Sequence, residues 1–189
     1  MNLPNKLSLL RIILVPIMVA LFYMTFIPFN YLITAIVFAI AAFTDFLDGH
    51  IARKYGLVTD LGKFLDPIAD KILVIGAFII MLTCPCIFAG SFGFTFYQLV
   101  GGIGVTIIVA RELIVSVLRM LAAGKGIVLA AEKSGKIKTL VTDFAIIILL
   151  LSAEFSLLFI PGIILYIISV ALTVYSGMYY VVKNKEVFR

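Results

Sequence analysis

Long apolar runs, separated by short charged or Pro/Gly-containing segments, dominate the pattern of this chain. Within the runs the apolar positions are continuous and do not alternate with polar ones, which predicts helices and not the strands of a barrel. A helix needs about 20 apolar residues to cross the core of a lipid bilayer. Six runs approach that length, and we expect each to be a transmembrane helix: roughly 7–27, 31–53, 66–83, 97–121, 136–153 and 161–182.

The segment that leads into the first run, NLPNKLSLLR, mixes polar and apolar residues. Such a segment can lie along the membrane surface as a short amphipathic helix. We therefore expect an all-α integral membrane protein with six transmembrane helices and a short N-terminal interfacial helix. No change in composition marks a second unit, so residues 1–189 are expected to form a single membrane-embedded domain.

Composition strengthens this picture and adds an orientation. The chain is 63% hydrophobic and 13% charged, which leaves too little polar surface to coat a soluble globule. Fourteen of its fifteen Lys and Arg residues lie in the N-terminal segment, in 53–71, in 119–138 and in the C-terminal tail. The positive-inside rule then places both termini and the charged loops in the cytoplasm. The net charge of +5 indicates contact with anionic lipid headgroups, not nucleic-acid binding.

Two small motifs receive structural interpretations. Cys84 and Cys86 flank Pro85 and are too close in the sequence for an easy mutual disulfide. No further Cys or His stands nearby to complete a zinc site. We expect both cysteines to be structurally neutral. GGIG at 101–104 lacks the Lys-Ser/Thr of a phosphate loop, so small residues that allow close helix packing are the better interpretation.

Four aspartates interrupt the apolar pattern between the second and third runs. Asp45 and Asp48 are three residues apart and Asp66 and Asp70 are four apart, so on helices each pair shares one face. Two pairs on neighbouring helices can converge, and converging carboxylates repel unless protons, basic side chains or cations compensate them. Oxygen ligands with no His or Cys nearby favour a hard ion, Mg²⁺ or Mn²⁺.

Small and basic residues accompany the aspartates. Gly49, Ala52 and Gly62 leave room for a ligand to approach the backbone, and the planar guanidinium of Arg53 suits phosphate. Together these features describe a diphosphate site. The alternative is that the carboxylates are solvated helix caps or partners of nearby lysines. The complete set favours a functional site, because ionisable groups in membrane helices are costly.

The spacing of these residues resembles the signature of the CDP-alcohol phosphatidyltransferase family. That pattern is D-x-x-D-G-x-x-A-R, eight residues, then G-x-x-x-D-x-x-x-D, and it is matched by Asp45, Asp48, Gly49, Ala52, Arg53, Gly62, Asp66 and Asp70. The resemblance implies a six-helix fold, a site for two Mg²⁺ or Mn²⁺ ions, the lipid donor CDP-diacylglycerol and release of CMP. It also implies a homodimer.

The same resemblance assigns roles to the matched positions. Asp45, Asp48 and Asp66 would be metal ligands, and Asp70 would be both a metal ligand and the general base. Binding of the donor would fall to Asp48, Gly49, Ala52, Arg53 and Gly62.

A basic cluster bears on the acceptor. Arg111 and Arg119 on the fourth run, with Lys136 at the start of the fifth, give a surplus of positive charge that suits an anionic acceptor. The alternative is a set of salt bridges, such as Glu112 with Arg119, and topology signals. The segments NLPNKLSLLRIILVP, ARELIVSVLR and GKIKT resemble the branch of the family that uses sn-glycerol 3-phosphate. By that resemblance Arg111, Arg119 and Lys136 would hold the acceptor phosphate, joined by Asn5.

Two other functions stay open at this stage. One is the same transfer to another acceptor, such as inositol phosphate, serine or phosphatidylglycerol. The other is a cation transporter whose aspartates line an ion path. A transporter is expected to place acidic residues near the bilayer midplane beside broken helices. Here the carboxylates crowd the cytoplasmic ends of two runs, which favours a headgroup enzyme that works with membrane lipids.

Overall fold

The computed structural model describes residues 3–55, 60–89, 93–125 and 133–185, without the side chains of residues 3–4, 46–55, 60–61, 63–64, 89, 94, 97–98 and 133–134. The described residues form helices and turns and contain no strand. Six helices are long: α1 Leu3–Tyr23, α2 Asn30–Tyr55, α3 Asp60–Thr83, α6 Gly104–Gly124, α7 Lys133–Ser152 and α8 Phe159–Lys183. They correspond one to one with the six predicted runs.

Short elements join the long helices at one end of the bundle. α4 (Pro85–Ala89) follows α3, and α5 (Phe94–Phe96) leads through a π-helix, Tyr97–Ile103, into α6. A single 3-10 turn, Ser156–Leu158, precedes α8. The fourth predicted helix therefore begins as expected near residue 97, but its first turns are wound as a π-helix.

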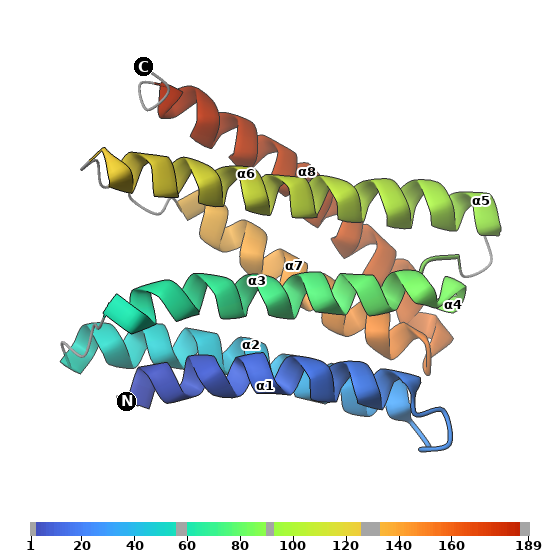
Figure 1. The fold of residues 1–189 in the computed structure, drawn as a ribbon. Helices are drawn as coiled ribbons and strands as arrows, with labels where there is room; N and C mark the ends of the chain where they lie inside the picture. Colours follow the sequence, from blue (N-terminus) through green and yellow to red (C-terminus); the bar gives the residue numbers. More distant parts are fainter. Residues whose placement is uncertain (1–2, 56–59, 90–92, 126–132, 186–189) are drawn as a thin grey trace.

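The long helices pack as two connected groups (Figure 1). α1 packs on α2 and α3, whereas α7 and α8 pack on each other, with α6 against α8 and α2 against α7. Both termini lie at one end of the bundle, together with the C-terminal ends of α2 and α6 and the N-terminal ends of α3 and α7 (Figure 1). The basic segments flank these ends, so the positive charge gathers at one end of the molecule, as the sequence predicts.

Three of the described helices are long and apolar enough to cross a membrane by themselves, within Asn5–Tyr23, Leu99–Gly124 and Ser156–Lys183. The apolar part of α2 that meets the same test of composition is shorter, Asn30–Asp45. In both α3 and α7, the most apolar stretch of 18 residues contains three charged residues. These include Asp70 in α3 and Lys138 in α7. α3 and α7 thus bring charge into the bundle, and Asn30–Asp45 is the part of α2 whose side chains the structure describes.

The N-terminal segment differs from the prediction. Residues 3–10 are not a separate interfacial helix, because they form the first turns of α1. Asn5, Ser8 and Arg11 are all buried, at 3%, 0% and 0% exposure. Ser8 and Arg11 lie on one face of α1 and donate hydrogen bonds to carboxylates of α3 and α2. A mixed pattern that looks amphipathic in the sequence is here an internal polar face.

The expectation for the two cysteines was wrong, because Cys84 and Cys86 form a disulfide. Their Cα atoms are 5.3 Å apart, within the range that a disulfide bridges. The chain turns at Pro85 from α3 into α4, which brings the two side chains to the same side.

The packing role expected for the GGIG motif is confirmed. A Cβ atom on Gly101 would lie 3.1 Å from the ring of Phe88, and one on Gly104 would lie 2.9 Å from Cζ of Tyr166. The Tyr166 hydroxyl donates to the carbonyls of Val100 and Gly101 at 3.2 and 3.1 Å. The glycines therefore let α8 approach the π-helical turn closely.

Candidate active site

The acidic signature lies on α2 and α3. Asp45 is in α2 and is 41% exposed, and Asp66 and Asp70 are partly buried in α3. Gly62 is buried near the start of α3. The remaining signature positions follow Asp45 in α2, but their side chains lie outside the described residues: Asp48, Gly49, Ala52 and Arg53.

The polar face of α1 contacts both acidic helices. Arg11 Nη1 donates to Asp45 Oδ1 at 2.7 Å, and the Arg11 side chain is 0% exposed. The Ser8 hydroxyl donates to Asp66 Oδ1 at 2.5 Å. Sequence reasoning missed both contacts. The available signal was the spacing of Asn5, Ser8 and Arg11, three residues apart each, which puts three polar side chains on one face of an otherwise apolar helix.

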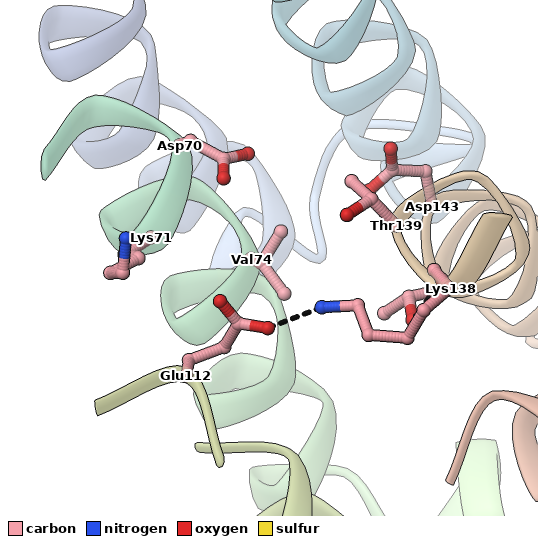
Figure 2. Close-up of a pocket in the computed structure, with 8 residues that line it drawn as sticks. Asp70, Lys71, Val74, Glu112, Lys138, Thr139 and Asp143 are labelled. Atoms are coloured by element: carbon pink, nitrogen blue, oxygen red, sulfur yellow. Dashed lines mark hydrogen bonds and ion pairs between the residues drawn. The ribbon is translucent and has the colours of Figure 1, made fainter. Parts of the chain in front are cut away.

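A small cavity lies where α3, α6 and α7 meet (Figure 2). Its volume of about 10 Å³ has room for about one water molecule. Asp70 and Lys71 line it from α3, Glu112 from α6, and Thr139 and Asp143 from α7, together with Val74, Lys138 and Thr142. Asp70 of the acidic signature is thus placed beside charged residues of the second half of the chain.

Glu112 joins the basic residues on one side of this cavity. Its carboxylate oxygen Oε1 accepts from Lys138 Nζ, drawn as a dashed line in Figure 2, and from Arg111 Nη1 at 3.2 Å. All three side chains are largely buried, at 13%, 6% and 14% exposure for Glu112, Lys138 and Arg111. Asp70 and Asp143 line the same cavity, so acidic and basic side chains are equal in number in and beside it: Asp70, Glu112 and Asp143 against Lys71, Arg111 and Lys138. The partner of Glu112 is therefore Lys138 across the α6–α7 contact, and no bond between Glu112 and Arg119 is seen.

Arg111 continues the network to α8. Its Nη2 donates to the Ser176 hydroxyl at 3.2 Å. Gly177 makes this possible, since a Cβ there would lie 2.9 Å from Cγ of Arg111. The buried Nε of Arg111 has no hydrogen-bond partner among the described residues. The two terminal nitrogens of Arg111 are thus held by Glu112 and Ser176, while its Nε remains a donor without a partner among the described residues.

The other predicted acceptor residues lie closer to the end of the bundle. Arg119 is exposed, and its Nε donates to the Tyr180 hydroxyl at 3.2 Å. Lys136 is exposed on the first turns of α7, two residues before Lys138. Neither lines the cavity. Asn5 lies on α1, on the acidic side. The structure therefore brings Arg111 beside the cavity but does not gather all four candidates around it.

The donor atoms match a hard divalent cation in kind. Asp45, Asp66 and Asp70 offer only carboxylate oxygens, the ligands that Mg²⁺ and Mn²⁺ prefer. Among the residues that the structure describes, no three acidic, His or Cys side chains are grouped closely enough to hold an ion. Asp48, the fourth predicted ligand, falls in the part of α2 without described side chains.

Comparison with known proteins gives consistent matches over the whole chain. A Bacillus subtilis (strain 168) protein called CDP-diacylglycerol--glycerol-3-phosphate 3-phosphatidyltransferase is 40% identical, covering 100% of this chain and 97% of that protein. Proteins of the same name from Rickettsia bellii (strain RML369-C) and Salmonella choleraesuis (strain SC-B67) are 38% and 33% identical. They cover 99% and 95% of this chain, and 97% and 92% of their own lengths.

The sequence pattern of one family matches residues 1–175, which includes the acidic signature, the basic cluster and most of α8. This is a longer stretch than the motifs alone cover. The chain belongs to the CDP-alcohol phosphatidyltransferase family.

Proposed function

We propose that this chain is a phosphatidylglycerophosphate synthase. It transfers the phosphatidyl group of CDP-diacylglycerol to sn-glycerol 3-phosphate and releases CMP. The observation that carries the proposal is the likeness to relatives of that name over nearly their whole length. The cavity supports it, because Asp70 shares that space with Lys138 and with Glu112, to which Arg111 donates.

The acidic half binds the donor in this proposal. Asp45, Asp48, Asp66 and Asp70 hold two Mg²⁺ or Mn²⁺ ions, which supply positive charge to the diphosphate and to the departing CMP. Gly49, Ala52 and Gly62 leave room for the nucleotide and diphosphate beside the backbone, and Arg53 contacts phosphate oxygens. The acyl chains of the donor stay in lipid while its headgroup enters at the charged end of the bundle.

Asp70 is the general base. Its carboxylate removes the proton from a hydroxyl of the acceptor as that oxygen attacks the phosphorus bound to diacylglycerol. The bond from this phosphorus to the CMP oxygen breaks, and CMP leaves as the anion. Direct attack is favoured because the signature contains no Ser, Cys or His nucleophile.

The basic half binds the phosphate of the acceptor. Arg111, Arg119 and Lys136 are the proposed ligands, and the partnerless Nε of Arg111 is a donor available to a phosphate oxygen. Asn5, on α1, is the fourth residue proposed to bind the acceptor phosphate. The cavity beside Asp70 is too small for the acceptor as it stands, so binding requires the side chains around it to rearrange.

The membrane arrangement belongs to the same proposal. Six helices cross the bilayer as one domain of residues 1–189, with both termini and the active site on the cytoplasmic side of the cell membrane. The protein works as a homodimer.

One experiment separates the enzyme from its alternatives. Purified protein receives labelled CDP-diacylglycerol and, in parallel, glycerol 3-phosphate, inositol phosphate, serine or phosphatidylglycerol. We expect labelled phosphatidylglycerophosphate and an equal amount of CMP with glycerol 3-phosphate alone. Turnover with another acceptor would keep the chemistry and replace the acceptor. No CMP with any acceptor, together with cation flux in proteoliposomes, would favour the transporter.

A further inference from the structure

We propose that Ser8 and Arg11 on α1 are positioning residues that orient the carboxylates of the metal site. This inference rests on the proposed function only in that Asp45 and Asp66 are taken as metal ligands. Ser8 and Arg11 are three residues apart on one face of α1, and each donates to one aspartate of a different helix. One helix thereby fixes one carboxylate from each half of the acidic signature.

The geometry of both contacts suits an orienting role. The Ser8 hydroxyl donates to Asp66 Oδ1 at 2.5 Å, and the Arg11 guanidinium donates to Asp45 Oδ1 at 2.7 Å. A donor on one carboxylate oxygen restricts the rotation of the whole carboxylate, and so the direction in which its oxygens face a cation. Outer partners of this kind commonly set metal affinity by 10–100-fold.

Burial argues against other uses of this face. Ser8 and Arg11 are both 0% exposed, so neither can bind a lipid headgroup or the solvent without unfolding part of α1. A fully buried guanidinium is expensive unless a specific anion compensates it, and Asp45 is that anion. The polar face of α1 is therefore built for its contacts with α2 and α3.

Mn²⁺ binding to the detergent-purified, metal-stripped protein tests the role of Ser8 without measuring turnover. The signal of free Mn²⁺ in electron paramagnetic resonance gives the Kd for the wild type, Ser8→Ala and Ser8→Thr. We expect Ser8→Ala to raise the Kd about tenfold, and Ser8→Thr to stay near the wild type because the hydroxyl remains. Ser169→Ala is the matched control, since Ser169 is also 0% exposed but donates to the Tyr166 carbonyl in α8.

Arg11→Lys tests the second contact and keeps the positive charge, so only the donor geometry changes. We expect its Kd for Mn²⁺ to rise about tenfold as well. Unchanged affinity in both Ser8→Ala and Arg11→Lys would overturn the inference and leave the proposed function standing. A wild type that does not bind Mn²⁺ would instead overturn the metal site. Equal weakening by Ser169→Ala would show a general effect of buried substitutions and would also overturn the inference.

Discussion

The α1–α3 group and the α6–α8 group differ in how they pair their carboxylates. In the first, Arg11 and Ser8 of α1 donate to Asp45 of α2 and Asp66 of α3. In the second, Arg111 and Lys138 both donate to Glu112, and Asp143 lines the same cavity. In the first group one helix donates to carboxylates of two other helices, whereas in the second two basic side chains share one carboxylate. The difference fits the proposed function, in which the first group receives a cation and the second an anion.

Metal removal should have the largest effect, because it takes away the ligand proposed for the acidic half. Treatment with EDTA and dialysis should reduce transfer from CDP-diacylglycerol to background, and added Mg²⁺ or Mn²⁺ should restore it. CMP release measures both the loss of transfer after chelation and its recovery after the metal is added. EDTA saturated with Mg²⁺ beforehand is the control and should have no effect. Full turnover after exhaustive chelation would mean that the acidic half does not depend on a cation.

Asp70→Asn should lower kcat by about 10³-fold, because it removes the base while keeping the volume of the side chain. Asp143→Asn is the matched control: the same substitution, in the same cavity, but on α7. We expect it to change kcat by about tenfold or less. Circular dichroism should show that both variants are folded. A normal rate for Asp70→Asn would remove Asp70 from the chemistry, and equal losses would assign the base to neither group alone.

Glu112→Gln should destabilise the basic half, because Arg111 and Lys138 would then be buried without their shared anion. Removing one member of a buried ion pair costs about 3–5 kcal/mol, which corresponds to a midpoint lower by roughly 6–20 °C for a chain of this size. Thermal unfolding in detergent, followed by circular dichroism, measures the change.

Two further variants test this interpretation of Glu112. The double variant Glu112→Gln with Lys138→Met should recover most of the midpoint, because only Arg111 then stays charged. Glu154→Gln is the control, since the Glu154 carboxylate accepts from the Tyr31 amide and has no buried cation beside it. If Glu112→Gln melted like the wild type, the charge balance of the basic half would not depend on this carboxylate.

Lys136→Ala and Arg119→Ala should raise the apparent KM for glycerol 3-phosphate about tenfold, the cost of one hydrogen bond to a charged group. The KM for CDP-diacylglycerol should not change, because the donor is bound by the acidic half. Initial rates at varied acceptor and fixed donor, and the reverse, separate the two values. Lys125→Ala, exposed at the end of α6, is the control. Equal effects on both substrates would break the division of labour between the halves.

The spacing of residues along one helix predicted much of this arrangement, but it did not predict the contacts between helices. The separations of Asp45, Asp66 and Asp70 placed the acidic signature on two adjacent helices. The same reasoning paired Glu112 with Arg119, seven residues on, because both share a helix face. In the fold Arg119 instead meets Tyr180 of α8, and Lys138 of α7 reaches Glu112. Which neighbour a face meets depends on how helices pack, and a single helix does not contain that information.

The N-terminal segment shows the same limit. Its mixed polar and apolar residues predict an interfacial helix, since polar residues at a membrane usually face water or headgroups. Ser8 and Arg11 face Asp66 and Asp45 instead. Whether polar residues meet lipid headgroups or protein carboxylates follows only from the packing of α1 on α2 and α3.

Loss of the Cys84–Cys86 disulfide should have the smallest effect of all. The bond lies just beyond the C-terminal end of α3, at the start of α4 and at the end of the bundle opposite to the N-terminal end of α3 (Figure 1). It joins residues only two apart in sequence, so it restricts the unfolded chain little, by about 1–2 kcal/mol. The double variant Cys84→Ser with Cys86→Ser should melt a few degrees lower, about 2–8 °C, and should keep kcat and both KM values within about twofold. The proposed chemistry lies at the charged end of the bundle. A tenfold loss of kcat in a folded variant would therefore show that the two ends of the bundle are coupled.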